Sequence, residues 1–322
     1  MAILIIGGAG YIGCHTVAEL LDQKKEIVVL DSLEKGHRNA ILGGKFYCGN
    51  IDNEEFLERV FTENEIQSVI HFAAYSLVGE SVVNPDKYYK NNVGCTLKLL
   101  EKMNEHAVKK IVFSSTAAVY GEPQKTPIEE GEDTMPTNPY GETKLTIEKM
   151  LKWFDSAYGI KYVSLRYFNA AGAHTSGRIG EDHHPETHLI PIIMQAALGK
   201  RDKLQVYGDD YDTPDGTCIR DYIHVTDLAS AHILALKHLD EGGDSRVYNL
   251  GNGKGFSVKE VIDMAKRVTG RKIDYEVVSR RPGDPAVLVA SSKRIMKELG
   301  WKPEYNGLEK IVETAWKWHS RI

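Results

Sequence analysis

The sequence predicts an α/β protein built on a doubly wound parallel sheet, followed by a smaller lobe of mixed α/β structure. Three observations support this prediction. Short apolar runs alternate with helical patterns through the first half of the chain, a glycine-rich turn follows the first run, and small or polar residues follow the later ones. Strands that are joined by helices pair in parallel, so the residues after them are expected to meet at one crevice.

Length and composition narrow the possibilities. The chain has 322 residues, of which 42% are hydrophobic, enough for a large core and, by usual domain sizes, two lobes. A net charge of −5 argues against nucleic acid or an anionic membrane as the main partner. The four cysteines lie far apart without a C-x-x-C pair, and no signal or membrane segment precedes the first strand. We therefore expect a cytoplasmic protein with reduced thiols.

The first expected strand, residues 2–6, runs into the turn Gly7-Gly8-Ala9-Gly10-Tyr11-Ile12-Gly13 and then into a helix. Glycines let the backbone turn tightly and approach a pyrophosphate, which then lies at the positive end of the helix. A second strand, residues 27–30, ends in Asp31. A carboxylate there accepts hydrogen bonds from both ribose hydroxyls of NAD and repels a 2′-phosphate, which favours NAD over NADP. The alternative is an aspartate that merely starts a loop.

The alternation continues through the first lobe, which we assign to residues 1–170. Further strands are expected at 45–48, 68–74, 111–116 and 162–167, and helices at 55–61, 88–106 and 140–158. A polar loop rich in glycine and histidine then marks the boundary to a second lobe, residues 171–322. Part of residues 220–250 is a candidate to pack back on the first lobe. The second lobe is expected to contain helices at 190–198, 225–239, 258–268, 293–299 and 308–318, and strands at 204–207, 247–250 and 287–290.

Tyr140 and Lys144 are spaced i and i+4 at the start of a predicted helix, which places them on one helix face. A nearby ammonium favours a phenolate and lowers the phenol pKa from about 10, which makes a tyrosine usable as a base. Thr116 is placed to hydrogen-bond the hydroxyl from which Tyr140 removes the proton. A short Tyr-x-x-x-Lys pattern in a chain with 16 tyrosines is, taken alone, more often a surface pair.

Two clusters suggest metal sites, but neither pattern fits one. His183, His184 and His188 are interrupted by Pro185, no H-E-x-x-H helix is present, and no distant cysteine or carboxylate completes a ligand set. We predict no metal there and interpret the segment as a loop that contacts substrate. The acidic segment at 209–215 has Pro214 where a calcium loop needs a ligand, which favours a solvated loop.

Arginines in the second lobe suggest a phosphate site. Arg220 precedes a strand-like step, and Arg280 and Arg281 precede Asp284. Two separated guanidinium groups suit a diphosphate, with Asp284 left to accept hydrogen bonds from ribose hydroxyls. Ordinary surface ion pairing is the alternative.

Five segments together carry a resemblance to a known family: residues 7–13 (GGAGYIG), 114–121 (SSTAAVYG), 139–144 (PYGETK), 166–169 (RYFN) and 220–225 (RDYIHV). By these motifs, in this order, the chain resembles the extended short-chain dehydrogenases/reductases, and among them the enzymes that invert C4 of UDP-hexoses. The similarity extends from Ala2 to about Trp318.

The resemblance implies a doubly wound Rossmann sheet that binds NAD and a second lobe that binds a UDP-sugar. It implies that Tyr140 is the base, that Lys144 binds the nicotinamide ribose and lowers the pKa of Tyr140, and that Thr116 hydrogen-bonds the sugar. The implied reaction, which belongs to galactose metabolism, oxidises C4 to a 4-keto sugar that turns about its diphosphate link and is reduced from the other face. NAD is regenerated in each turnover and is therefore held tightly.

The resemblance also implies two sets of contacts. The NAD contacts are Gly7, Gly10, Tyr11, Ile12, Gly13, Asp31, Ser32, Asn50, Ile51, Phe72, Ala73, Ala74, Ser76, Asn91, Thr116, Tyr140, Lys144 and Phe168. The UDP-sugar contacts are Thr116, Tyr140, Asn169, His188, Leu189, Gln205, Val206, Tyr207, Arg220, Arg281, Asp284 and Leu288.

Four positions depart from the family pattern. Asn50 replaces a common Asp near the adenine, Ser76 replaces a basic residue, and His188 stands where Asn is frequent. Leu288 stands where some relatives carry Tyr beside the sugar. Since Leu is smaller than Tyr, N-acetylated sugars such as UDP-GlcNAc are further candidate substrates.

Two other functions are alternatives to this reaction: that of a nucleotide-sugar dehydratase or decarboxylase of the same group, and that of a catalytically dead relative that binds NAD as a sensor or scaffold. A nucleotide-sugar dehydratase would carry an acidic pair after the active-site Thr, whereas Ala117 and Ala118 follow Thr116 here. A catalytically dead sensor would have no need of Thr116, Tyr140 and Lys144. Homodimers are common among such folds, and the helices at 88–106 and 140–158 are the candidates for pairing.

Overall fold

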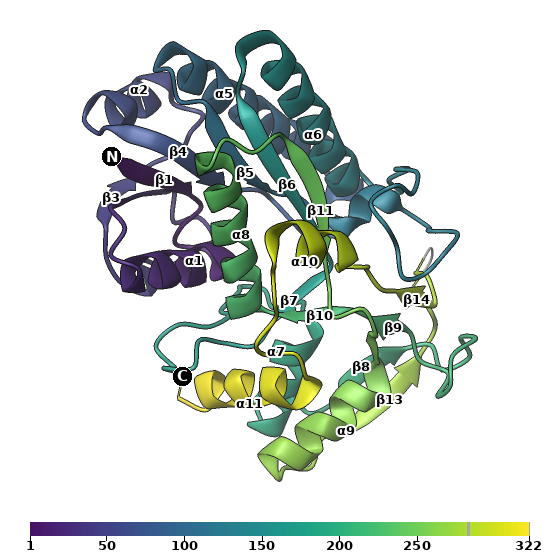
Figure 1. Ribbon diagram of the computed structural model, residues 1–322. Helices are drawn as coiled ribbons and strands as arrows, with labels where there is room; N and C mark the ends of the chain where they lie inside the picture. Colours follow the sequence, from purple (N-terminus) through teal and green to yellow (C-terminus); the bar gives the residue numbers. More distant parts are fainter. Residues whose placement is uncertain (282–283, 322) are drawn as a thin grey trace.

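The computed structural model describes residues 1–281 and 284–321 and confirms a doubly wound α/β fold (Figure 1). Seven strands form the large sheet in the order β11-β6-β5-β4-β1-β2-β3, and every neighbouring pair is parallel. The strands are β1 (Ala2–Ile6), β2 (Ile27–Asp31), β3 (Lys45–Cys48), β4 (Ile66–His71), β5 (Lys110–Ser114), β6 (Lys161–Tyr167) and β11 (Arg246–Leu250). The order reverses between β1 and β4, the point at which such sheets bind ligands.

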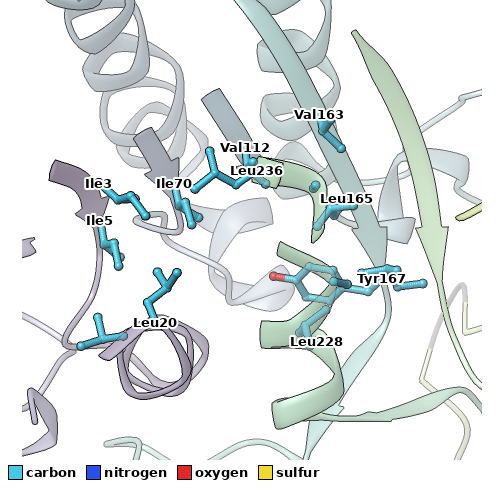
Figure 2. Packing of buried hydrophobic residues seen from close by; sticks show 14 of the residues in the cluster. Ile3, Ile5, Leu20, Ile70, Val112, Val163, Leu165, Tyr167, Leu228 and Leu236 are labelled. Atoms are coloured by element: carbon cyan, nitrogen blue, oxygen red, sulfur yellow. The ribbon is translucent and has the colours of Figure 1, made fainter. Parts of the chain in front are cut away.

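Helices cover both faces of this sheet. On one face α1 (Tyr11–Asp22) and α8 (Val225–Asp240) pack over alternate strand residues, including Ile5, Ile70 and Val112, as Figure 2 shows. The other face packs on α2 (Glu54–Thr62), α5 (Cys95–Glu105) and α6 (Pro139–Tyr158). Neighbouring strand residues point to opposite faces, so both core layers need apolar side chains and the strands are continuous apolar runs. Burying each such side chain contributes about 1.5–3 kcal/mol.

The structure corrects the predicted helix at 88–106, which is not one regular helix. It consists of α4 (Pro85–Tyr88), a π-helical turn η2 (Tyr89–Gly94) and then α5. Within η2 the buried Asn92 side chain bonds the backbone N–H and carbonyl of Tyr75, at 2.9 and 3.1 Å. These tertiary bonds give a physical reason for the local change in winding. A short helix α3 (Val78–Val83), just before this region, was not predicted.

The strands β4 and β5 are shorter than predicted. β4 ends at His71 and β5 at Ser114, so residues 72–74 and 115–116 lie in the connections that follow. The main-chain N–H groups of Phe72 and Ala73 both bond the carbonyl of Ile6 rather than continuing the ladder. Short 3₁₀ turns occur at η1 (Arg38–Ala40) and η3 (Ala117–Tyr120).

The remaining chain forms a second core around α7 (Leu189–Ala197), α9 (Val258–Thr269) and α11 (Leu308–His319). Small sheets accompany these helices: β7 (Asn169–Ala171) with β10 (Tyr222–His224), β8 (Leu204–Tyr207) with β13 (Tyr275–Val278), and β12 (Phe256–Ser257) with β9 (Ile219–Arg220) and β14 (Val287–Leu288). The helix α10 (Lys293–Leu299) lies near β11 in Figure 1.

Residues 225–250 return to the large sheet, since α8 covers one of its faces and β11 forms its edge. The division into two functional lobes at residue 170 stays a prediction. Among the helices of the described residues, none has the length and apolar character needed to cross a membrane.

Candidate active site

A cavity of about 970 Å³ lies at the carboxyl ends of the large sheet. Its wall includes the residues that follow β1, β2, β4, β5 and β6, together with parts of α7, β8, β9 and β14. Every residue that the sequence predicted for the catalytic, cofactor and sugar sites lines this cavity. The prediction that these positions converge is therefore confirmed, while their individual roles are not tested by position alone.

The glycine turn before α1 depends on two glycines. Gly7 has a φ of 80°, and a Cβ added to Gly13 would lie 2.1 Å from the Gly7 carbonyl oxygen. A side chain at Gly13 would force α1 away from the end of β1, and one at Gly7 would meet the backbone N of Ala73, after β4, at 2.6 Å. The first turn of α1 holds no acidic residue, so its N-terminal N–H groups present a positive end to the cavity. This cradle fits a pyrophosphate.

Asp31 ends β2 and is buried, with 8% of its surface exposed. Its carboxylate accepts hydrogen bonds from the N–H groups of Ala9 at 2.9 Å and Leu33 at 2.8 Å. These bonds fix its orientation at the cavity wall. A carboxylate has about four acceptor positions, so capacity remains for ribose hydroxyls.

The local sequence explains where Tyr140 and Lys144 lie. The Asn138 side chain caps α6 by accepting from the Gly141 N–H at 3.0 Å, and Pro139 occupies the first helical position. Tyr140 and Lys144 thus fall in the first turns of α6, beside the end of β5. The Lys144 ammonium donates to the Ser114 carbonyl at 2.8 Å, which ties α6 to that strand end.

The acid–base properties of this pair differ from the expectation. Burial raises the pKa of Tyr140, and a side-chain hydrogen bond with Thr116 opposes that rise. Burial also lowers the pKa of Lys144 to about 7, with Glu148 opposing the change. The sequence predicted a lowered pKa for Tyr140, whereas the protein alone raises it, because desolvation outweighs the neighbouring groups.

Sequence reasoning missed the buried network beneath the pair. The Glu148 carboxylate accepts from the Ser115 hydroxyl and forms an ion pair with Arg166, whose side chain also donates to the Tyr120 hydroxyl at 2.8 Å. Both charged side chains are 7% exposed. The network joins α6, the residues after β5, β6 and η3. Its sequence signal was the position of Glu148, which lies four residues after Lys144 on the same helix face.

The arginine site is also arranged differently from the prediction. Arg220 and Asp284 form an ion pair with each other, so in this structure the two groups are not separately available. The guanidinium carbon of Arg281 lies 3.9 Å from the ring centroid of Tyr207, in a cation–π arrangement. Arg280 pairs with Asp210 at 2.6 Å. Ordinary ion pairing, the alternative to a phosphate site, therefore accounts for Arg280.

The histidine segment needs a correction as well. Sequence reasoning looked for a distant cysteine or carboxylate and overlooked two near ones, Glu181 and Glu186, which both contact His183 and His188. His184 points away, with 95% of its side chain exposed. The signal was visible in the sequence, because both glutamates lie within three residues of His183.

A pyrophosphate cradle at a helix N-terminus, an acid after the second strand and a buried Tyr–Lys pair define a dinucleotide-dependent protein of the short-chain dehydrogenase/reductase type. Residues 3–251 match the family described as the NAD dependent epimerase/dehydratase family. The chain belongs to this family, and NAD is its cofactor.

Relatives share this fold over nearly the whole chain. UDP-glucose 4-epimerase of Halalkalibacterium halodurans is 61% identical over 319 residues, covering 99% of this chain and 96% of the relative. A crystal structure of UDP-glucose 4-epimerase from Bifidobacterium longum with NAD⁺ and UDP has a TM-score of 0.94 and 43% identity, covering 100% and 98% of the two chains. The UDP-Glc/GlcNAc 4-epimerase of Campylobacter jejuni has a TM-score of 0.88 and 44% identity, covering 100% and 99%.

Proposed function

We propose that the protein reversibly inverts C4 of UDP-glucose and UDP-galactose, with a transient 4-keto sugar, in galactose metabolism. The observation that carries the proposal is that Tyr140, Thr116 and Lys144 lie in one cavity with the pyrophosphate cradle. The identity of 61% to a UDP-glucose 4-epimerase over almost the whole chain supports the same reaction.

The residues supply proton transfer and positioning. Tyr140 takes the proton of the C4 hydroxyl and later returns it to the same oxygen after the keto sugar has turned, and Thr116 holds that hydroxyl by a hydrogen bond. Lys144, fixed by Ser114, binds the nicotinamide ribose next to the phenol. When bound, NAD would supply an acceptor for hydride from C4 and the same hydride for return to the opposite face of C4, and its positive ring would favour the phenolate that burial alone disfavours.

The UDP portion is proposed to lie along the second lobe. Arg281, stacked on Tyr207, and Arg220 are cations of this wall, and a diphosphate would draw Arg220 from its partner Asp284. Asn169, His188 and Leu189 line the same side. Such contacts hold the nucleotide while the sugar turns.

The competing dehydratase function has less support. Ala117, which follows Thr116, is 1% exposed and carries no acid, and Ala118 donates its N–H to the Thr116 hydroxyl at 3.1 Å. Elimination of water needs an acid that this position does not supply.

Proton NMR of the purified protein with UDP-galactose, and no added NAD, tests the proposal. Growth of the UDP-glucose anomeric signal to a constant ratio would establish inversion with cofactor carried through purification. If the spectrum stays unchanged even after NAD is supplied, the proposal is wrong and a sensor role gains weight.

N-acetylated UDP-sugars are proposed as further substrates because Leu288, which is smaller than Tyr, lines the cavity. We expect wild type to interconvert UDP-GlcNAc and UDP-GalNAc, and Leu288→Tyr to lose this activity at least about tenfold while keeping UDP-galactose turnover, since a larger ring removes space rather than chemistry. Parallel NMR assays of both substrates check this. No activity of either protein on UDP-GalNAc would contradict it.

The protein is further proposed to act as a cytoplasmic homodimer. All four cysteines are among the described residues and carry free thiols, with Cys48 exposed, which suits a reducing compartment. The outer sides of α5 and α6 carry exposed apolar residues, namely Leu97, Trp153 and Tyr158, which suits contact with a second copy.

A further inference from the structure

The loop that leads into α7 gathers metal-ligating side chains outside the proposed catalytic pair. Glu181, His183, Glu186 and His188 each offer one ligand atom, and these atoms all lie within 4.8 Å of one another. Only 4% of the Glu181 side chain and 5% of the Glu186 side chain is exposed. Two carboxylates buried together need positive charge to balance them.

The separations suit a small cation. His188 Nδ1 lies 2.8 Å from a Glu181 oxygen and 3.3 Å from a Glu186 oxygen, while His183 Nδ1 lies 3.3 and 3.8 Å from oxygens of the same two residues. Ligand atoms around a tetrahedral zinc ion, with bonds of about 2.0–2.1 Å, lie about 3.4 Å apart. Among Glu181 Oε1, Glu186 Oε2 and the two histidine Nδ1 atoms, the distances of 2.8, 3.3 and 3.8 Å bracket that value, and the remaining 3.3 Å contact, from His188, is to Glu186 Oε1.

Hydrogen bonds among the four side chains do not satisfy all of their polar atoms. His183 Nδ1 is buried and forms no hydrogen bond among the described residues. Each imidazole nitrogen faces both carboxylates, but one N–H can point to only one of them. A divalent ion with two neutral imidazoles would neutralise both carboxylates and occupy all four groups.

The surrounding backbone orients one ligand in advance. The N–H groups of Thr187 and His188 donate to Glu186 Oε1 at 2.7 and 2.8 Å, so the carboxylate is held with Oε2 toward His183. Such outer contacts are usual for metal ligands.

We propose that Glu181, His183, Glu186 and His188 bind a divalent first-row transition-metal ion, for which zinc is the best fit. The ion is structural and anchors the loop to the cavity wall, which three of the four ligands line. The edge-on packing of Tyr11 against His183, with centroids 6.3 Å apart, links the site to the glycine turn.

Zinc content tests the proposal without an activity assay. Tag-free protein carrying Cys48→Ser, which removes an exposed thiol, is treated with chelator, incubated with zinc chloride, dialysed and analysed by mass spectrometry. We expect close to one zinc ion per chain, and at least about tenfold less in His183→Gln/His188→Gln. His184→Gln is the matched control, because this exposed neighbouring histidine lies outside the cluster. Equal zinc in the double variant, or none in the parent, would overturn the site.

The visible absorption spectrum of the cobalt(II)-loaded protein provides a second test. It needs no His→Gln variant, so its outcome does not depend on whether such a variant folds. A four-coordinate site gives intense visible d–d bands on addition of cobalt chloride to the chelated protein, whereas hexaaqua cobalt gives weak ones. Absence of intense bands would mean that the four residues form an ion-pair cluster only.

Discussion

At the scale of single residues, the proposed chemistry depends on the phenol of Tyr140. We expect Tyr140→Phe to lower kcat by about 10²–10⁴-fold, the usual contribution of a positioned acid or base, while NAD remains bound. Initial rates from NMR and cofactor content from absorbance check this. Tyr158→Phe is the matched control, since Tyr158 ends the same helix with 50% of its surface exposed. If the rate of Tyr140→Phe is within threefold of the control, the assignment of the base is wrong.

Residue spacing predicted part of this site and not the rest. The i, i+4 spacing found Tyr140 and Lys144 because helix geometry is local. The direction in which the pKa of Tyr140 shifts was not predictable from the sequence, since the shift depends on how deeply the fold buries the phenol. Likewise, the ion pair between Arg220 and Asp284 joins residues 64 positions apart, and no pattern in the sequence indicates that they meet.

At the scale of elements, the helix α6 carries a solvent-facing Trp153 that is 70% exposed. We expect wild type to run as a dimer of the 36.0 kDa chain, and Trp153→Glu to shift it to monomer, because a buried unpaired carboxylate is costly at an interface. Light scattering after size exclusion measures both masses. Met296→Glu on α10, also at an exposed apolar residue, is expected to stay dimeric. A monomeric wild type would contradict the proposal.

Elements with continuous apolar or strongly periodic sequence were predicted correctly. The strand β13 was missed because three of its four residues are exposed and no apolar run marks it. The strands β9 and β12 have two residues each, which is too few to show an alternation of apolar and polar side chains. The π-helical turn η2 depends on the tertiary bonds of Asn92, so local propensity predicted an ordinary helix.

At the scale of the whole molecule, the connection rule for parallel strands predicted the sheet type, because right-handed crossovers leave few alternatives. It did not place β11, which follows several elements of the second core and then returns to the sheet edge. That return follows from the packing of α8 on the sheet, where Leu228 and Leu236 complete the layer seen in Figure 2.

Buried histidines make the stability of the whole protein depend on pH. They lie in different parts of the fold, since His71 bonds Thr96 of α5 and His224 bonds Thr314 of α11. Burial lowers the pKa of His15, His71 and His224 to about 3 and that of His232 to about 4. An unfolded chain has a histidine pKa of about 6.5. The stability from these neutral imidazoles is therefore complete above that pH and is lost as the pH falls toward the folded values. From pH 7 to pH 5 each histidine should cost about 2 kcal/mol.

Urea unfolding of the NAD-bound protein at pH 7, 6 and 5 measures this loss. His232→Gln should reduce the difference between pH 7 and pH 5 by about 2 kcal/mol, because glutamine takes up no proton in the unfolded state. His184→Gln is the matched control, since that side chain is 95% exposed in the folded protein. A free energy of unfolding that is constant from pH 7 to pH 5, or an equal slope in both variants, would show that these histidines are protonated within the fold.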